Sequence, residues 1–331
     1  MNINELESEI FDIEKTNFEE KALAVFRFQA LHLPIYKQYI ELLKIDISSI
    51  HSIHHIPFLP ISFFKSTEIY IPKKDENCMP SLVFKSSGTT GQIPSKHFVT
   101  DPTIYETSFL KTFQSFFGDV HQYCILGLLP SYIERGNSSL VYMVNQLIKK
   151  SEHSSSNFYL DNQETLYQVI LKLEEQKQPT LLFGVTYALI DFAEKYPMPL
   201  NYVKIIETGG MKGRREELTR KEVHALLKNA FSIPHIFSEY GMTELLSQAY
   251  SLQNGIYEAP NWLRVLVREL SDPLTIKSIG KGAINIIDLA NLYSCSFIAT
   301  DDYGEVFENH SFEINGRIEQ SEIRGCSLLT V

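Results

Sequence analysis

Apolar residues near the start of the chain recur at helical spacing. Across residues 17–45 they return once per helix turn, which predicts amphipathic helices. Pro34 lies within this stretch and predicts a break between two helices, because proline has no backbone N–H to continue the hydrogen-bond ladder. Residues 51–71 are richer in proline, phenylalanine and isoleucine, and we expect an extended connector there.

Short apolar runs then alternate with amphipathic segments. We expect strands at residues 81–84, 122–129, 180–185 and 203–207. We expect helices at residues 101–117, 138–150, 166–176, 187–195 and 215–230. Because strands and helices alternate, the sequence predicts an α/β domain with a largely parallel sheet.

The pattern changes after about residue 254. We expect short strands at residues 263–269, 283–288 and 295–300, and interpret them as a smaller β-rich portion appended to the α/β body. The serine-rich stretch at residues 151–157 is expected to form a surface loop.

Composition and charge exclude several classes of protein. The formal net charge of −10 argues against nucleic acid as the main partner, because binding to phosphate backbones relies on clustered lysine and arginine. No apolar stretch approaches the roughly 18 residues of a membrane span, and residues 1–20 are polar and acidic, unlike a secretory signal. The four cysteines are widely spaced, which argues against a disulfide framework or a structural zinc site. We therefore expect a reduced, cytoplasmic protein.

The most informative stretch is the loop after the first predicted strand. It reads Ser86-Ser87-Gly88-Thr89-Thr90-Gly91, followed by Pro94 and Lys96. Its glycines let the backbone approach an anion, and its hydroxyl and backbone N–H groups can donate to phosphate oxygens. Such clusters are also common in plain hydrophilic turns, and the GxxxxGK[ST] pattern of a Walker A loop is missing. From the residues alone, a phosphate site and a simple turn both stay open.

Further motifs give this loop a more specific interpretation. The chain also contains Tyr240-Gly241-Met242-Thr243-Glu244, Thr300-Asp301-Asp302 and Gly316-Arg317, in that order. Together with the loop they resemble the motifs of the adenylate-forming superfamily, which includes acyl-CoA synthetases, luciferases and peptide-synthetase adenylation domains. Stretches at residues 58–60, 64–65, 129–132, 138–140, 207–213 and 324–326 resemble the LuxE-type acyl-protein synthetases of the fatty-acid reductase complex.

This resemblance implies a fold and a division of the chain. The fold is the α/β large N-terminal domain of adenylate-forming enzymes, with parallel-rich sheets and a small β-rich portion. Residues 1–75 would form an N-terminal helical segment and connector, residues 76–316 the adenylation domain, and residues 317–331 a truncated hinge and C-terminal arm. Since the chain stops at Val331, we expect the family's C-terminal lid, with its catalytic lysine, to be largely absent. Slow adenylation, completion by a partner, or replacement of that lysine by Lys96 or Lys281 stay open.

The resemblance also implies which residues hold the phosphates of ATP and a Mg²⁺ ion. Lys96 would assist the loop, although its spacing departs from the common Gly-x-Pro-Lys form. Thr243 would bond the α-phosphate and Glu244 would bind Mg²⁺, a cation that takes one or two carboxylates together with phosphate and water. Without the motif, Glu244 would be interpreted as a surface carboxylate. The residues expected to hold the β- and γ-phosphates are Ser86, Ser87, Gly88, Thr89, Thr90 and Gly91.

Other motif residues would hold the nucleoside. Tyr240, followed by Gly241, would pack on the adenine, and its plain alternative is core packing. Asp302 would accept hydrogen bonds from the ribose hydroxyls, although only register separates it from Asp301. Arg317 would contact ribose or phosphate, or else form a surface salt bridge. The backbone beside the adenine would come from Gly209 and Gly210, which could equally form a strand-ending turn.

Cys326 is a candidate acceptor of the acyl group. In LuxE-type proteins a cysteine near the C-terminus attacks the acyl-adenylate, and the thioester is delivered to a reductase. Arg324 could favour the thiolate form of Cys326, which is the nucleophilic form. The plain alternative is that Cys326 is a small buried or idle thiol. The expected partners are a carboxylic acid, in this family a fatty acid, and an acyl-CoA-reductase-like protein or acyl carrier. Transfer to coenzyme A or a carrier protein, or a non-catalytic subunit with a degenerate nucleotide site, are the alternatives.

Overall fold

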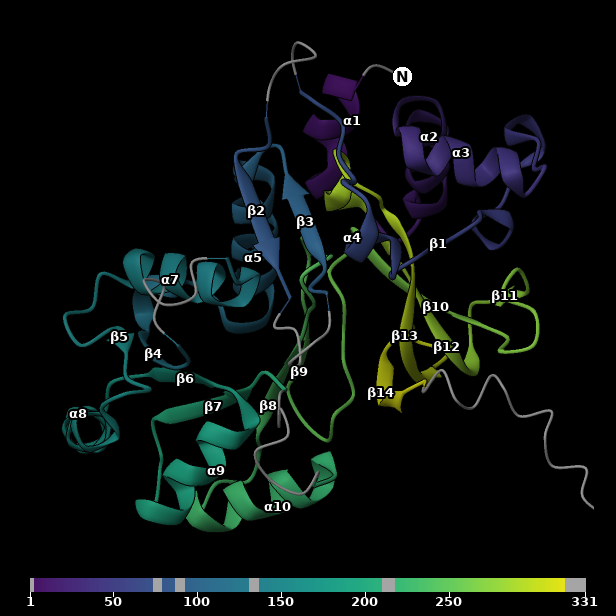
Figure 1. The fold of residues 1–331 in the computed structure, drawn as a ribbon. Coiled ribbons are helices and arrows are strands. Elements are labelled where there is room, and N and C mark those ends of the chain that lie inside the picture. Colours follow the sequence, from purple (N-terminus) through teal and green to yellow (C-terminus); the bar gives the residue numbers. More distant parts are fainter. Residues whose placement is uncertain (1–2, 74–78, 87–92, 131–136, 210–217, 319–331) are drawn as a thin grey trace, which may run out of the picture.

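Two six-stranded sheets form the body of the molecule (Figure 1). The computed structural model describes residues 3–73, 79–86, 93–130, 137–209 and 218–318. Loop residues 87–91, which are expected to bind phosphate, lie outside these ranges, as do Gly210 and Cys326.

The first sheet is largely parallel, as the alternation of strands and helices predicts. Its order is β5-β4-β6-β7-β8-β9, and only β9 runs antiparallel to its neighbour. The strands are β4 (Cys124–Leu128), β5 (Asn157–Phe158), β6 (Thr180–Gly184), β7 (Val203–Glu207), β8 (Phe237–Tyr240) and β9 (Ala249–Ser251). Every residue of β4 and β6 is buried, as expected for central strands covered on both faces.

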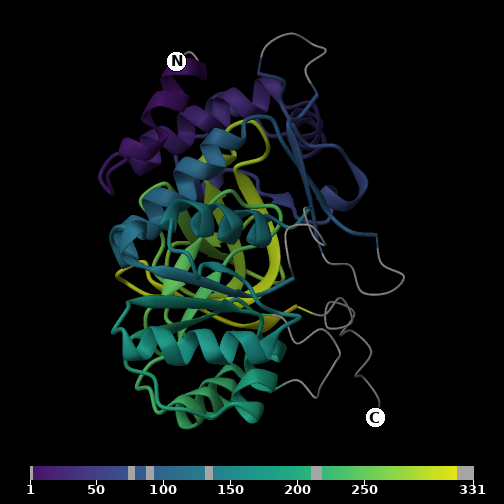
Figure 2. The same ribbon diagram turned by 90° about the vertical axis from the view of Figure 1, so that its left-hand side faces the viewer.

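Helices cover both faces of this sheet (Figure 2). One face carries α5 (Pro102–Phe117) and α7 (Ser139–Ser151), and the other carries α9 (Thr186–Lys195) and α10 (Arg220–Phe231). A further helix, α8 (Gln163–Glu175), precedes β6. The layered arrangement leaves the carboxyl ends of the parallel strands as the edge where ligands bind in such folds.

The second sheet is mostly antiparallel and has the order β1-β13-β12-β10-β11, with β14 paired to β13. The short strand β1 runs parallel to β13, so the N-terminal segment contributes to this sheet. The strands are β1 (Leu59–Pro60), β10 (Leu263–Arg268), β11 (Ile276–Lys277), β12 (Gly280–Asp288), β13 (Phe297–Val306) and β14 (Phe312–Arg317).

A hairpin and a group of helices complete the fold. The hairpin consists of β2 (Leu82–Lys85) and β3 (Lys96–Val99), and Phe84 packs edge-on against Tyr105 of α5. The N-terminal helices are α1 (Ile3–Glu9), α2 (Phe18–His32), α3 (Pro34–Leu42) and α4 (Phe63–Ser66). Short 3₁₀ turns lie at η1 (Ile10–Asp12), η2 (Ile47–Ser49), η3 (Ile53–His55), η4 (Val120–Gln122) and η5 (Leu289–Asn291).

Most expected elements are confirmed, and the differences have local causes. The break at Pro34 is confirmed, since proline begins α3 directly after α2 ends. The helix expected from residue 215 begins at Arg220, because Thr219 caps it together with Glu222 in a reciprocal capping box. The strands expected to be short near the C-terminal end are longer than predicted, since β12 and β13 have 9 and 10 residues.

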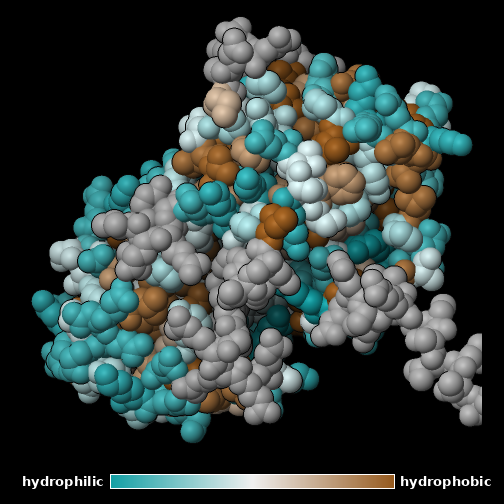
Figure 3. Space-filling view, in the orientation of Figure 1, coloured by the Kyte–Doolittle hydropathy of each residue, from teal (hydrophilic) through white to brown (hydrophobic). Residues whose placement is uncertain are grey.

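The surface is of mixed character. On the face shown in Figure 3, hydrophobic residues form separate groups among hydrophilic ones. Within the residues that the structure describes, no helix combines the length and apolar character needed to cross a bilayer.

Candidate nucleotide site

The base of the serine- and glycine-rich loop is closed by two serines. Ser86 follows β2 and Ser95 precedes β3. The Ser95 N–H donates to Ser86 Oγ at 2.9 Å, and the Ser86 N–H donates to the Ser95 carbonyl at 3.1 Å. The five residues from Ser87 to Gly91 lie outside the described residues, so their expected contacts with phosphate stay predictions.

Ser95 also lies close to Glu244. The Glu244 carboxyl group is only 5% exposed. Burial raises the pKa of Glu244, while the nearby Ser95 side chain and the charges of Arg317 and Lys65 act in the opposite direction. Glu244 is therefore a buried carboxyl beside the phosphate-loop hairpin, and its interpretation as a surface carboxylate is wrong.

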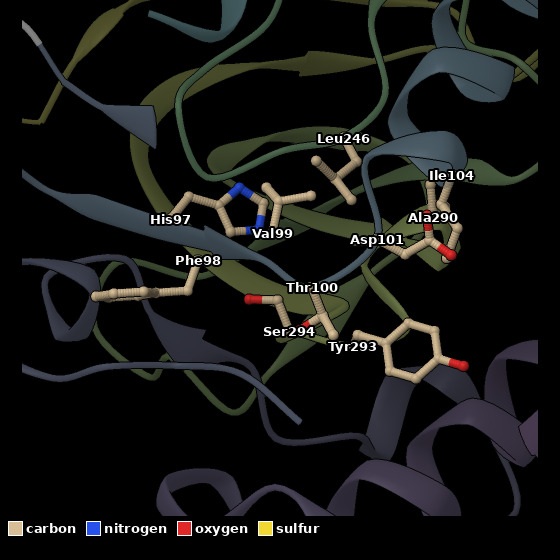
Figure 4. Close-up of a pocket in the computed structure, with 10 residues that line it drawn as sticks. All are labelled: His97, Phe98, Val99, Thr100, Asp101, Ile104, Leu246, Ala290, Tyr293 and Ser294. Atoms are coloured by element: carbon tan, nitrogen blue, oxygen red, sulfur yellow. The ribbon is translucent and has the colours of Figure 1, made fainter. Parts of the chain in front are cut away.

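His97, which the sequence did not single out, makes a second contact between the hairpin and this motif. Its Nδ1 lies 2.8 Å from the carbonyl oxygen of Thr243, and its ring meets Phe64 edge-on at 5.8 Å. Burial lowers the pKa of His97 to about 4, so the ring is neutral near pH 7 and Nδ1 donates its hydrogen to the carbonyl. Figure 4 shows His97 and Val99 on one side of β3 and Phe98 on the other, as strand alternation requires.

Asp302 and Tyr240 bring the two sheets together at the site. The Tyr240 hydroxyl donates to Asp302 Oδ2 at 2.7 Å, and the Arg317 Nε lies 3.6 Å from Oδ1. Burial raises the pKa of Asp302, while the Tyr240 hydrogen bond and the Arg317 charge oppose that rise. Asp301, in contrast, is exposed. The register of β13 thus turns Asp302 toward Tyr240 and its cross-strand partner Arg317.

The ring of Tyr240 rests on an aromatic cluster. Its centroid lies 5.7 Å from that of Tyr257 and 5.5 Å from that of Phe312. Tyr240 is half-buried, so part of the ring stays accessible beside Asp302. An aromatic ring held in this way offers a stacking surface for a flat base.

Gly209 lies at the carboxyl edge of the parallel sheet, two residues after β7. Its φ of +73° lies in the left-handed region that favours glycine, and a Cβ there would meet nothing within 4 Å. Its N–H donates to Glu207 Oε1 at 2.8 Å. The open space next to Gly209 fits the expected approach of a base, and Gly210 lies outside the described residues.

Lys96 and Lys281, the lysines expected to add charge at the site, do not join this network. Lys96 is exposed and lies opposite Lys85 in the β2–β3 register. Among the described residues, neither Lys96 nor Lys281 makes a hydrogen bond or ion pair with Glu244 or Asp302. Lys281 forms an ion pair with Glu305 at 3.3 Å on the second sheet.

The donors and charges of this network suit a magnesium nucleotide. In the described part of the chain no three histidine, cysteine, aspartate or glutamate side chains cluster as a metal site. Mg²⁺ does not need such a cluster, because it keeps water and phosphate ligands and takes one or two carboxylates. The buried Glu244 carboxyl beside the phosphate-loop hairpin meets that requirement.

Comparison with known proteins identifies the family to which the chain belongs. The model of the LuxE acyl-protein synthetase family matches residues 7–330. The chain belongs to the LuxE acyl-protein synthetase family. No curated protein matches the LuxE-family chain in sequence.

Solved structures share the fold at low sequence identity. ATP-bound MatB from Rhodopseudomonas palustris has a TM-score of 0.54 and 15% identity, over 75% of this chain and 50% of MatB. An open conformation of 2-hydroxyisobutyryl-CoA ligase in complex with 2-HIB-AMP and CoA has a TM-score of 0.62 and 11% identity, over 91% of this chain and 75% of the ligase. The luciferase-like enzyme of the mealworm Zophobas morio has a TM-score of 0.51 and 14% identity, over 76% of this chain and 60% of that enzyme. The LuxE-family chain thus has the N-terminal-domain fold of adenylate-forming enzymes and spans half the length of MatB.

Supporting residues of the site were missed by the sequence analysis. Asp288 is fully buried and accepts hydrogen bonds from the backbone N–H groups of Leu246 and Ser247, which follow Glu244. Asn291 donates to the Glu244 carbonyl at 2.8 Å. The sequence gives little indication of their role, because each is a single polar residue in a stretch of otherwise hydrophobic core residues.

Proposed function

We propose that this protein activates a carboxylic acid with ATP and passes the acyl group to the thiol of Cys326. The observation that carries the proposal is the hydrogen bond from His97 of the β2–β3 hairpin to the carbonyl of Thr243, which places the hairpin beside the buried Glu244. Nearby, Tyr240 adds an aromatic surface and Asp302 adds a carboxylate. The Tyr240 hydroxyl and Asp302 Oδ2 are 2.7 Å apart. Family membership over residues 7–330 supports the same chemistry.

The reaction has two steps. A carboxylate oxygen of the acid attacks the α-phosphorus of ATP, so that an acyl–phosphate bond forms, the bond to the β-phosphate breaks and pyrophosphate leaves. The Cys326 thiolate then attacks the acyl carbon, a carbon–sulfur bond forms and AMP leaves with the electron pair of the broken bond. Because two anions must meet in the first step, the site has to supply donors and positive charge.

Each residue of the site has a proposed role in the first step. Ser86 and the loop after it donate hydrogen bonds to the β- and γ-phosphates, with Lys96 adding charge. Thr243 bonds the α-phosphate, and Glu244 holds Mg²⁺, which neutralises phosphate charge when bound. Arg317 adds positive charge beside Asp302, from which it lies 3.6 Å. The residues of the nucleoside part are Gly209, Gly210, Tyr240, Gly241 and Asp302.

Cys326 is favoured as acceptor over the cysteines inside the fold. Cys124 and Cys295 are buried, and burial raises the pKa of their thiols to about 11 and about 12. Thiols with such pKa values are almost entirely protonated near neutral pH and are poor nucleophiles. We further propose a fatty acid as the substrate class, a reductase-like protein as recipient of the thioester, and residues 76–316 as the adenylation domain.

The acceptor is tested with a radiolabelled acid, ATP and Mg²⁺. The wild-type chain should acquire a label that hydroxylamine removes, as expected for a thioester. Cys326→Ser should still release pyrophosphate but should carry no label, whereas Cys78→Ser, which removes another cysteine, should be labelled normally. A label retained on Cys326→Ser contradicts the carrier role, and thioester found only on added coenzyme A assigns the acyl group to that acceptor.

A further inference from the structure

A second group of polar side chains is buried on the opposite side of β8 from Tyr240. Successive residues of a strand point to opposite faces, so Glu239 points away from the proposed nucleotide. It lies directly across from Tyr250 of β9 in the antiparallel register. Glu239 is 9% exposed and Tyr250 is 1% exposed, so both side chains are removed from bulk water.

Two buried polar groups of this cluster lack a hydrogen-bond partner. Within the described residues, none bonds the Tyr250 hydroxyl or the Gln248 Oε1, and both residues lie beside Glu239. Among the same residues, the Gln248 amide has one partner, the Tyr105 hydroxyl at 3.5 Å. Buried polar groups are nearly always paired in folded proteins, and an unpaired one costs about 1–3 kcal/mol. Two of them beside the Glu239 carboxyl group indicate a missing partner.

Gly241 leaves room for the Glu239 carboxyl group against the backbone of the motif. A Cβ at this exposed position would lie 2.4 Å from Glu239 Oε1 and 3.5 Å from the Gln248 side chain. Its φ is not in the left-handed region, so the backbone does not require glycine here. The absent side chain instead lets the Glu239 carboxyl group lie directly against the motif that holds Thr243 and Glu244.

We propose that Glu239, Gln248 and Tyr250 form a subsite for a hydrogen-bonding substituent on the carboxylic acid, such as a hydroxyl or oxo group. The inference rests on the proposed adenylation and refines its substrate class from a plain fatty acid to a polar-substituted one. The subsite lies one residue from Tyr240 and beside Gly241, so an acid bound there can present its carboxylate near the proposed α-phosphate position.

The chemistry of the three groups fits a neutral polar guest. Burial, and next the charge of Glu207, raise the pKa of Glu239 to about 8, so the carboxyl carries its proton near pH 7. A protonated carboxyl donates one hydrogen bond and accepts others, the Tyr250 hydroxyl does the same, and Gln248 Oε1 accepts. A hydroxyl group satisfies a donor and an acceptor together, whereas an alkyl chain leaves the Tyr250 hydroxyl and Gln248 Oε1 unpaired.

The test compares matched acids in ATP–pyrophosphate exchange. Straight-chain acids of several lengths are paired with their hydroxylated counterparts, and kcat/KM is measured for each pair. The wild type should prefer the hydroxylated member of at least one pair by about tenfold or more, because sites built to hydrogen-bond a substrate reject analogues that lack the group. Glu239→Leu and Tyr250→Phe should lose most of that preference, and Glu239→Gln should retain part of it.

A control variant removes a tyrosine hydroxyl elsewhere. The Tyr159 hydroxyl donates to the Ser155 carbonyl at 2.8 Å, away from β8, so Tyr159→Phe should keep the wild-type preference. An equal or better reaction of the plain member in every pair overturns the subsite, as does an unchanged preference in Glu239→Leu; water then fills the cluster.

Failure of the proposed function gives a different pattern. If no acid supports exchange, calorimetric binding of the same pairs still measures the subsite. Tighter binding of the hydroxylated acids that Glu239→Leu abolishes keeps the subsite while adenylation fails, and equal binding of both members overturns it.

Discussion

The free energy of unfolding is expected to fall as the pH rises from about 6 to about 9. Glu239→Gln should make this fall much smaller. Burial and the neighbouring Glu207 charge raise the pKa of Glu239 from the ordinary value of 4.5 to about 8 in the folded chain. The folded state therefore binds this proton more tightly than the unfolded state does. The stabilising contribution is full below the unfolded pKa and is lost as the pH rises through the folded pKa.

The magnitude follows from the pKa. Each pH unit between about 6 and 8 removes 1.36 kcal/mol, so the free energy of unfolding should fall by about 3 kcal/mol. For a chain of 331 residues this corresponds to a drop in Tm of about 4 °C. Glutamine has a similar shape and no titratable proton, so the variant should lack this component.

The assay is thermal unfolding followed by circular dichroism at several pH values, in buffers matched for ionic strength. Other groups that titrate in this range, such as the cysteines, affect wild type and variant alike and cancel in the difference. Parallel curves of Tm against pH for the wild type and Glu239→Gln would refute the reasoning, because they would mean that the carboxyl is ionised in the folded chain at pH 6.

Three other substitutions probe the proposed nucleotide site. Asp302→Asn removes the charge beside Arg317 and weakens ribose hydrogen bonds, so calorimetry should give about 10- to 100-fold lower ATP affinity; unchanged affinity would contradict that role. Glu244→Gln should lower Mg²⁺-dependent pyrophosphate exchange by about 100-fold or more, and a smaller loss at saturating Mg²⁺ would exclude it as the metal ligand. His97→Leu should lower kcat by about tenfold while His97→Asn, whose amide can donate to the Thr243 carbonyl, restores most of it; equal losses would show that the hydrogen bond is unimportant.

The sequence predicted the parallel sheet well because its strands carry a strong local signal. The apolar runs of β4, β6 and β7 are flanked by amphipathic helices, and each was expected within a few residues of its observed bounds. The strand β8 was missed, since Phe237–Tyr240 has two polar residues between two aromatic ones and no apolar run. The two-residue strand β1 has too few residues for any periodicity.

The candidate site was predictable only where short motifs mark it. Glu244, Tyr240 and Asp302 lie in such motifs, and the choice between Asp301 and Asp302 needed the register of β13. His97 and Thr243 are 146 residues apart, so their contact leaves no trace in local sequence. The unpaired groups of Gln248 and Tyr250 likewise become visible only when the chain is folded, because pairing depends on every neighbour in space.

The central claim is that the hairpin at Ser86, the buried Glu244 and the Tyr240–Asp302 pair form one nucleotide site. A crystal structure with Mg²⁺ and a non-hydrolysable ATP analogue tests this most directly. We expect the phosphates beside Ser86, the metal on the Glu244 carboxylate and the ribose hydroxyls on Asp302. An analogue bound elsewhere, or none bound at saturating concentration, would contradict the account.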